Sequence, residues 1–421
     1  MSVEAVISTQ VIDTTSVGRS LMTAADAAAA RTAADAQVTL VSGTNIKTVN
    51  STSLLGSGDI TVGLSGTGAV DNAALRADGT GGATLQTSAF VIEDNATASP
   101  NNTVNHASIQ ATGGTTNVSV SIVPKGTGAF CLQVPDGTAT GGNVRGDYAV
   151  DLQLGRASAN EVASGYGAFA AGLQCRASGS RAVAVGLQTV ASGDFSFAAN
   201  YLSTASGTGS TAFGGSSCAG TQSITVGDIT SAAGSQSIGV GYQCFATGNQ
   251  SQAFGYICST GGGAYAMAHG INAGAYQHAM YAHSAGQFAG NGDAQSVRYV
   301  CRNKTTNSTP TTLFLDGSST RLTVASGRIF SFTARITGIK SDGTAAAHYV
   351  RKGTIKRVSN TTSLVGSIET IGTDVEDNAS TDVSITADDT NEALQISVTG
   401  IAAETWRWVA VVEGLEIAYG T

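Results

Sequence analysis

The sequence predicts an all-β protein: an oligomeric parallel β-roll, or solenoid, with a C-terminal β-sandwich or jelly-roll domain and a short N-terminal helix. Three observations predict this class. A 14-residue motif repeats in tandem over about residues 163–284, glycine supplies 54 of 421 residues against 4 prolines, and charged residues make up 12% of the chain. An average globular domain carries about twice that share of charge. The composition therefore favours a fibrous β protein over a compact enzyme.

Each copy of the repeat opens with a small residue and glycine and continues as an alternating run. The clearest copy, ASGSRAVAVGLQTV, covers residues 177–190, and residues 163–176 and 191–204 keep the same register. Alternation with a period of two indicates a strand with two different faces, and glycine at both ends supplies the freedom that a corner requires. Two strands of about five residues and two turns use up such a unit, which is one solenoid coil, and coils stack at about 4.8 Å. A disordered glycine-rich tract would not keep its register over so many copies.

The two faces of the repeat differ in size, and this difference leads to an expectation about assembly. Positions 7 and 9 carry the larger apolar residues, such as Val183 and Val185, and we expect these to fill the narrow interior of the coil. Positions 6 and 8 are small, such as Ala182 and Ala184, and would let another chain approach closely. A coil this thin buries little surface by itself, so the repeat predicts an oligomer. The fifth copy, which starts at residue 219, is one residue short.

The repeat resembles the head repeats of trimeric autotransporter adhesins, whose units read like Ser-Val-Ala-Ile-Gly followed by a small residue and glycine. The matching strings are AVAVG (182–186), SITVG (223–227), SIGVG (237–241) and SQAFG (251–255). The resemblance covers about 120 residues and implies a left-handed parallel β-roll with three chains packed side by side. Bacterial adhesins and phage tail fibres both use such repeats, so this resemblance leaves the function open.

The cysteines give little sign of metal binding. None of the six lies in a CxxC pair, and no histidine lies at metal-site spacing from them. Cys175, Cys244 and Cys258 share position 13 of their copies, so we expect them to stack as a column. Cys244 and Cys258 could then form a disulfide, but free, semi-buried thiols are the favoured alternative because cysteine packs well as a small hydrophobe. Free thiols also suggest assembly in a reducing cytosol.

Residues 1–63 are expected to attach the protein to a larger particle. The pattern of residues 23–36 predicts an alanine-rich helix with Thr23 as N-cap and Asp26 three residues later. A plain surface helix without a role in attachment would have the same pattern. The preceding stretch and this helix look like the N-terminal segments of phage tail fibres and related tail proteins.

The segment IKTVNSTSLLGSGDITVG, residues 46–63, predicts a strand, a Gly-Ser-Gly turn and a second strand. It is similar to the K-T-V-N-x-x-S-L-L-G-S-G-D-I-T segment that recurs in phage tail-fibre proteins, and residues 47–50 and 53–61 carry the match. The resemblance implies docking on a phage tail, a baseplate or an adaptor protein.

Residues 64–142 predict a β shaft and residues 143–292 the repeat itself. Valine or isoleucine alternates at positions 118, 120 and 122, and a strand is expected over residues 129–134, between two prolines. Residues 146–153 look like an imperfect first coil.

Charge and targeting signals separate the candidate classes. A formal net charge of −8 argues against a nucleic-acid partner, and the absence of a basic run argues against a membrane surface. The first twenty or so residues lack the pattern of a secretion signal, and no window of 18 apolar residues occurs. A trimeric autotransporter would need a secretion signal and C-terminal membrane strands. We therefore expect a structural protein of a phage virion, a tail fibre made in the bacterial host cytoplasm, with a bacterial cell-surface trimeric adhesin as the alternative.

Residues 293–421 predict a C-terminal β-sandwich tip. Strands are expected over residues 298–301, 311–315, 321–324, 329–336, 348–356, 363–371, 383–385, 393–398 and 405–412. ADDTNEALQISVTG (387–400), followed by TWRWVAVVE, resembles C-terminal modules of phage tail proteins. That resemblance implies a trimeric tip and names no ligand.

Loops on a rigid scaffold are where recognition usually lies, so we expect the tip to contact a host surface glycan or an outer-membrane protein. The polar loops of residues 340–344 and 373–380 are the candidates, together with Tyr349 and Arg351 if their strand is exposed. Trp406 and Trp408 could stack on sugars, but a W-x-W on a strand is more often core. The candidate receptor-binding residues are Lys340, Asp342, Tyr349, Arg351, Asp374 and Asp377.

The sequence predicts no enzyme, no cofactor and no metal site. Asp388 and Asp389 are adjacent, so in a strand-to-strand turn their side chains point apart, and turn hydrogen bonds explain them better than acid–base chemistry. His269, His278 and His283 could form rings on a three-fold axis, although polar packing is the favoured interpretation. A polysaccharide-cleaving tail spike, the third class considered, would need a carboxylate-lined groove, and the repeat region contains few acids.

Overall fold

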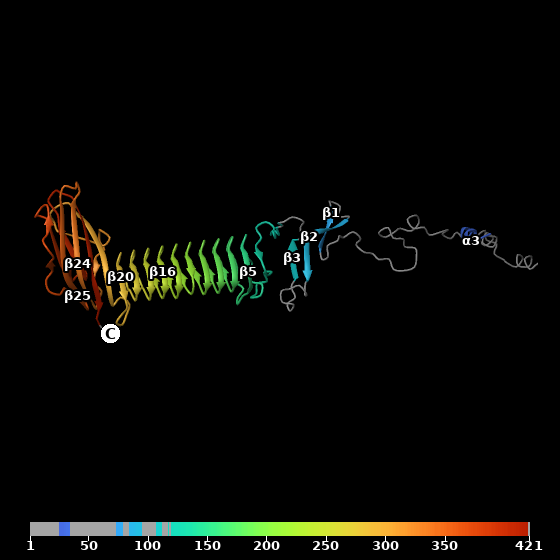
Figure 1. Ribbon diagram of the computed structural model, residues 1–421, viewed down its shortest axis with the longest axis horizontal. Helices are drawn as coiled ribbons and strands as arrows, with labels where there is room; N and C mark the ends of the chain where they lie inside the picture. Colours follow the sequence, from blue (N-terminus) through green and yellow to red (C-terminus); the bar gives the residue numbers. More distant parts are fainter. Residues whose placement is uncertain are drawn as a thin grey trace, which may run out of the picture. The chain divides into compact units, whose positions relative to one another are not determined.

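The computed structural model describes residues 25–33, 73–78, 84–94, 107–111, 117 and 119–419 (Figure 1). The chain divides into two compact units, Met1–Ile122 and Val123–Thr421. Strands dominate the described residues, so the predicted all-β class is confirmed. Among these residues, no helix has the length and apolar character needed to cross a membrane.

The described residues of the first unit form a short helix and a small sheet. In α3 (Ala27–Ala33), Asp26 is the N-cap, because its Oδ1 accepts hydrogen bonds from the amides of Ala28 and Ala29 at 2.9 and 2.8 Å. Thr23, the predicted N-cap, and the tail-fibre-like segment of residues 46–63 lie outside the described residues. The sheet is antiparallel, in the order β1 (Ala73–Asp78), β2 (Thr84–Asp94), β3 (Ala107–Ala111).

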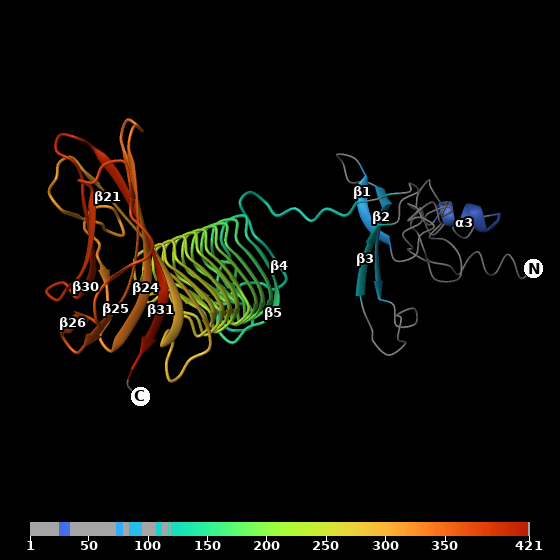
Figure 2. The ribbon, with the colours of Figure 1, turned by 60° about the vertical axis from the view of Figure 1, so that its left-hand side comes forward.

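The second unit begins with a parallel β-solenoid of about nine turns, which confirms the predicted β-roll (Figures 1 and 2). Residues 119–123 carry no strand, and the strand expected over residues 129–134 is limited to β4. The long strands that stack along one side are β4 (Phe130–Cys131), β5 (Val150–Gly155), β6 (Phe169–Leu173), β8 (Val183–Leu187), β10 (Phe197–Tyr201), β12 (Thr211–Phe213), β14 (Ile224–Asp228), β16 (Ile238–Tyr242), β18 (Gln252–Tyr256), β19 (Met267–Ile271) and β20 (Tyr281–Ala285).

The other side of each coil is shorter than the sequence predicts, because its strands have two residues and not about five. These strands form a six-stranded parallel sheet. They are β7 (Arg176–Ala177), β9 (Val190–Ala191), β11 (Thr204–Ala205), β13 (Ser217–Cys218), β15 (Ser231–Ala232) and β17 (Phe245–Ala246). The two corners therefore take up more of the 14 residues than expected.

Strand register confirms the period and corrects the place of the short copy. Val183 pairs with Phe169 on one side and Phe197 on the other, each 14 residues away. Cys218 pairs with Ala205 and Ala232, so it occupies the opening position that alanine holds elsewhere. The fourth copy, not the fifth, is therefore one residue short.

The assignment of the two faces is wrong in the sequence-based prediction, since the small residues lie inside. Ala182 and Ala184 have no exposed surface, whereas Val183 and Val185 are half-buried and point outward. The reason is the width of the coil. A Cβ built at Gly239, an inward position, would lie 3.2 Å from the carbonyl oxygen of Ser231 on the opposite wall. The interior of most coils therefore holds alanine, serine, threonine or cysteine, and most larger apolar side chains face out; the buried Met280, just before the last strand, is an exception.

The predicted column of position 13 lies in this interior. The thiols of Cys175, Cys244 and Cys258 donate to carbonyl oxygens of the next coil, at Gly186, Gly255 and Gly270, over 3.1–3.2 Å. All six cysteines of the chain are free, and these three are buried.

Glycine at position 10 is required by the stacking of the coils. Gly241 has φ +125°, and a Cβ there would lie 1.9 Å from the carbonyl oxygen of Gly255 in the next coil. We expect Gly241→Ala to lower the free energy of unfolding by at least ~3 kcal/mol, because the methyl group overlaps backbone that cannot move without separating two coils. Gly290→Ala is the control, since nothing lies within 4 Å of its Cβ position. Equal denaturation midpoints for the two variants would contradict this.

At the first coil, a buried ion cluster occupies the inward position that alanine holds in later coils. Asp151 takes the inward position that Ala170 holds in the next coil. Its Oδ2 accepts from Arg145 Nε at 2.7 Å and from Arg156 at 3.0 Å, and these side chains are almost fully buried. This ion cluster anchors residues 124–145 at the start of the solenoid, although Arg145 Nη2 and Asp151 Oδ1 are buried without a hydrogen-bond partner.

Removing the anion of this cluster leaves two buried guanidinium groups without a counter-charge. We expect Asp151→Ala to destabilise the solenoid by about 3–5 kcal/mol, measured by chemical denaturation. Asp147→Ala, an exposed carboxylate nearby, should change stability by less than about 0.5 kcal/mol. The role of the cluster would be refuted by an Asp151→Ala protein as stable as the Asp147→Ala protein.

At its other end the solenoid continues into antiparallel structure, since β20 pairs with β21 (Ala294–Thr305). Four long strands then lie side by side in the order β21, β31 (Trp406–Ala418), β24 (Arg328–Lys340), β25 (Ala346–Val358). The short strands β26 (Thr361–Leu364), β27 (Glu369–Thr370) and β28 (Val375–Glu376) pair with β25 in turn. This large sheet therefore begins at the last coil (Figure 2).

A second, four-stranded sheet covers one face of the first. It consists of β22 (Thr311–Thr312), β23 (Leu322–Thr323), β29 (Asp382–Asp388) and β30 (Ala393–Thr399). Buried side chains of both sheets belong to one hydrophobic core. Every strand predicted in this region overlaps an observed strand, and the strand predicted over residues 363–371 is divided between β26 and β27.

Candidate functional site

The aromatic residues that could stack on sugars lie in the core of the C-terminal sheets. Trp406, Trp408 and Tyr349 are each at most 1% exposed, which confirms the core role predicted for the tryptophans. Trp408 Nε1 donates to Thr305 Oγ1 at 3.0 Å. The Tyr349 hydroxyl bonds with Glu376 and Thr381 at 2.6 and 2.7 Å, and burial raises its pKa. Tyr349 was a candidate contact only if its strand were exposed; its own side chain is buried, and its role as a receptor contact stays a prediction.

Lys340 and Asp342 lie at the turn between β24 and β25. Lys340 Nζ contacts Asp342 Oδ2 at 3.3 Å and Glu404 Oε1 at 3.1 Å. Asp342 Oδ1 also accepts from the hydroxyl and the amide of Thr344, and these bonds lower the pKa of Asp342 to about 2. Both predicted residues are accessible, but their charges are already paired within the turn.

Arg351, Asp374 and Asp377 hold the edge strand β28 against β25. Arg351 is 7% exposed and donates both terminal nitrogens to Asp374, at 2.6 and 2.8 Å. This bidentate pair lowers the pKa of Asp374. Asp377 Oδ2 accepts from the amide of Ala346 at 2.8 Å. These three residues therefore lie close together and stabilise the edge of the sheet. Their role as receptor contacts stays a prediction.

The acidic pair and the histidines have structural partners. Asp388 accepts from Asn391 in the turn after β29, and Asp389 accepts from the amide of Thr362, so the two side chains serve different segments. His269 and His283 lie next to each other in adjacent coils, with ring centroids 5.5 Å apart and the rings tilted by 47°. Within the part of the chain that the structure describes, no three His, Cys, Asp or Glu residues lie close enough to hold a metal ion.

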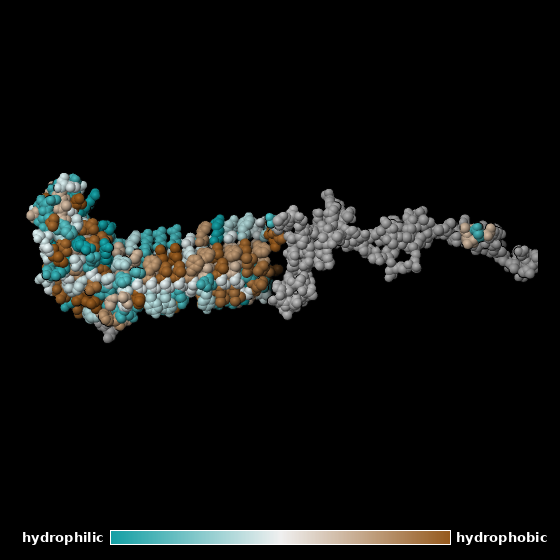
Figure 3. Space-filling view, in the orientation of Figure 1, coloured by the Kyte–Doolittle hydropathy of each residue, from teal (hydrophilic) through white to brown (hydrophobic). Residues whose placement is uncertain are grey.

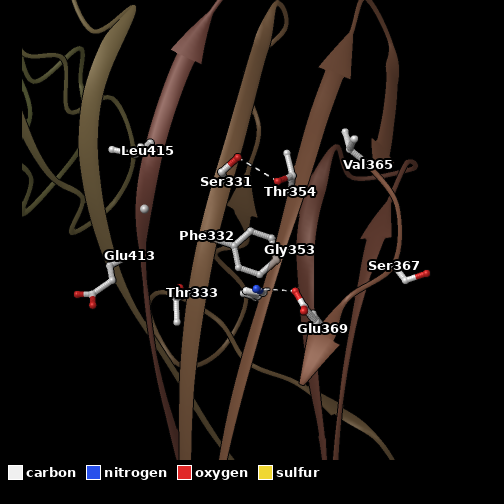
Figure 4. Close-up of a pocket in the computed structure, with 12 residues that line it drawn as sticks. Ser331, Phe332, Thr333, Gly353, Thr354, Val365, Ser367, Glu369, Glu413 and Leu415 are labelled. Carbon is white, nitrogen blue, oxygen red and sulfur yellow. Dashed lines mark hydrogen bonds and ion pairs between the residues drawn. The ribbon is translucent and has the colours of Figure 1, made fainter. Parts of the chain in front are cut away.

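The outer face of the large sheet carries a groove that the sequence analysis missed (Figure 4). The central strand β24 contributes short side chains there, Ser331 and Thr333, while longer ones rise from the strands on both sides. The groove has a volume of about 500 Å³. It is lined by Ser331, Phe332, Thr333, Lys352, Gly353, Thr354, Val365, Ser367, Glu369, Glu413, Gly414 and Leu415.

Hydroxyl groups and one ion pair define the chemistry of this groove. Ser331 and Thr354 share a hydrogen bond at 2.9 Å, and Lys352 pairs with Glu369 at 2.6 Å. The partner of Ser331 is another hydroxyl, which does not activate a nucleophile as a base would. These groups suit hydrogen bonding to a hydroxyl-rich ligand. The outward alternation of residues 331–333 was visible in the sequence, but not which neighbours would flank it.

A second surface runs along the solenoid. The outward positions of the long strands are apolar in most coils, and Figure 3 shows hydrophobic side chains in a band along the coils. Such a continuous apolar surface is unusual on a monomer and marks an interaction site. The half-buried or exposed members of this apolar face are Val183, Val185, Leu187, Phe197, Phe213, Ile224, Val226, Ile238, Val240, Phe254 and Met267.

The junction between the last coils and the large sheet contains a buried acid. Glu416 is 4% exposed, accepts from Gln295 Nε2 at 2.7 Å and lies 3.4 Å from Arg328. Arg328 also lies over the ring of Tyr276, 4.8 Å from its centroid. Burial raises the pKa of Glu416 to about 8, because the charged form loses its hydration.

This acid should make stability depend on pH. Between about pH 4.5 and 8 the folded chain keeps a proton that the unfolded chain releases, so the free energy of unfolding falls as pH rises, by up to about 1.4 kcal/mol per pH unit. Glu416→Gln should remove this slope and keep the bond to Gln295. The control is Glu413→Gln, whose carboxylate is 42% exposed beside Arg335. Denaturation curves at several pH values measure the slopes, and equal slopes in both variants would contradict the assignment.

No family model matches the chain, and no curated protein matches it significantly.

Proposed function

We propose that the protein is a structural tail fibre of a tailed bacteriophage that attaches the virion to the host cell surface as a homotrimer. The apolar face of the solenoid carries this proposal, because it demands a partner along the whole stack of coils. The C-terminal sheets form the outward, receptor-binding β-sandwich tip. Residues 1–63 dock on the tail, baseplate or an adaptor, as the tail-fibre-like segment of residues 46–63 implies.

A second and third copy of the chain are the partners that fit the apolar face best. The face repeats once per coil, at about 4.8 Å, and only a partner with the same axial period can match it over many coils. Other copies of this solenoid have that period. Three chains placed side by side around one axis would bury the apolar faces of all three, which agrees with the trimer implied by the adhesin-like repeats.

The apolar face can be tested without disturbing the coil interior. We expect the double variant Val185→Glu, Val240→Glu to abolish trimers, because burying six unpaired carboxylates in a trimer would cost several kcal/mol per site. The single chains should keep their strand content. Native mass measurement and circular dichroism give the two readouts, and Gln188→Glu, at an exposed corner, is the control. A wild-type monomer, or a trimer in the double variant, would overturn the proposal.

Attachment is tested with host cells. Purified trimer should compete with phage for adsorption, and a protein lacking residues 1–63 should still compete but no longer join particles. If trimer neither binds host cells nor slows adsorption, the function in attachment is refuted.

The two other classes remain distinguishable by experiment. A bacterial trimeric adhesin, which shares the repeat pattern, would be encoded among bacterial cell-surface genes and not among tail genes. A polysaccharide-cleaving spike would release oligosaccharides from host surface glycans, and the hydroxyl pair in the groove gives no support to that chemistry.

A further inference from the structure

Two cations face each other on the outer face of the large sheet. Lys304 on β21 and Arg407 on β31 are directly opposite in the antiparallel register, and both are exposed. Arg302 lies on the same face, two residues before Lys304. Among the described residues, no ion pair involves any of these three side chains.

Such an arrangement costs stability, because like charges directly opposite each other on neighbouring strands repel. Two other cations of this face have anionic partners. Lys352 is opposite Glu369 and pairs with it at 2.6 Å, and Arg335 pairs with Glu413 at 3.0 Å. Lys304 and Arg407, by contrast, each face a cation and not an anion across the neighbouring strand.

The three cations border a hollow of about 390 Å³. Arg302 is held in place by hydrogen bonds to the carbonyl oxygens of Leu315 and Asp316, at 3.2 and 2.8 Å. Close packing against Gly317 also holds the Arg302 side chain in place, since a Cβ at Gly317 would lie 3.0 Å from Arg302 Nε. Val409, 44% exposed, adds an apolar wall. The hollow is lined by Arg302, Asn303, Lys304, Asp316, Gly317, Arg407, Trp408 and Val409.

The acid in this hollow forms no ion pair with the three cations. The Asp316 carboxylate accepts from the amides of Ser318, Ser319 and Thr320 at 2.8–2.9 Å and from their hydroxyl groups. All of these donors belong to the same turn as Asp316, and their hydrogen bonds lower the pKa of Asp316. The hollow thus presents three cations, one of them a guanidinium held by hydrogen bonds, against a single carboxylate that is bound within its own turn.

We propose that this hollow binds the oxyanion of an acidic saccharide, a carboxylate or a phosphate. An oxyanion between Lys304 and Arg407 would relieve their repulsion, and guanidinium groups bind such anions strongly. The apolar wall suits the C–H face of a sugar ring. A net charge of −8 and a patch of three cations do not suit nucleic acid, which needs an extended basic surface. The inference rests on the proposed function, since a host surface would supply the saccharide.

Binding of small defined saccharides to the full-length protein tests this inference. The probes are trigalacturonate for the carboxylate, mannose 6-phosphate for the phosphate, and the methyl ester of trigalacturonate as a neutral control. Titration calorimetry at low salt should detect at least one of the charged probes and not the ester, and the tighter one identifies the oxyanion. Lys304→Gln and Arg407→Gln should each weaken binding about ten-fold, since each removes one charge-assisted bond.

The matched control is Lys356→Gln, which removes an exposed lysine from the same face of β25. Its affinity should equal that of the wild type, and Arg407→Gln should melt no lower than the wild type because it relieves a repulsion. The inference is overturned if neither charged probe binds, if the ester binds equally, if Lys356→Gln weakens binding as much as Arg407→Gln, or if a single-stranded oligonucleotide binds more tightly than the saccharides.

These outcomes are separate from those of the proposed function. Saccharide binding that survives Lys304→Gln and Arg407→Gln refutes the hollow, even where the trimer blocks phage adsorption. Saccharide binding lost in both variants supports the hollow, and a trimer without effect on adsorption would then refute the attachment function alone.

Discussion

The distance between the two walls of each coil is the constraint on which the rest of the solenoid depends. A side chain that points inward from the long strand meets backbone carbonyls of the opposite wall just beyond its Cβ, as the geometry at Gly239 demonstrates. Alanine, serine, threonine and cysteine fill that space in most coils. Because the interior accepts so little volume, the burial of large apolar groups that stabilises most proteins must occur outside the coil. The apolar outer face is thus a consequence of the thin interior.

A stack of identical coils has open edges at both ends, and each end is closed differently. At the start, Asp151 replaces alanine and binds two arginines, so the polar segment that covers the first coil is anchored by charge. At the other end the chain reverses from parallel to antiparallel pairing at β20 and β21, and the large sheet takes over the hydrogen bonds of the last coil. Unpaired strand edges invite association with other chains, so both devices restrict association to the sides of the solenoid.

The sequence contained the period, the strand positions and the change of architecture near residue 293, because these depend on local patterns of glycine and alternation. The sequence did not reveal which face of each strand points into the coil. The two faces of a strand are equivalent until the distance to the opposite wall is known. The larger residues were therefore assigned to the wrong face. For the same reason Tyr349 seemed a surface candidate, although the second sheet covers it. Lys304 and Arg407 lie 103 residues apart, so only strand pairing reveals that they face each other.

The apolar face of the solenoid and the hollow beside Lys304 and Arg407 lie on different elements. Only the symmetry of a trimer would link them. A trimer built on the apolar face would carry three copies of the hollow beside Lys304 and Arg407 on one rigid support. Several weak contacts to a repetitive surface polymer then act together, and the combined affinity exceeds that of a single site by orders of magnitude. A shallow site with three cations is consistent with such multivalent binding, because each copy then needs only a modest affinity. Substitutions on the apolar face should therefore reduce host binding even though they leave every hollow unchanged.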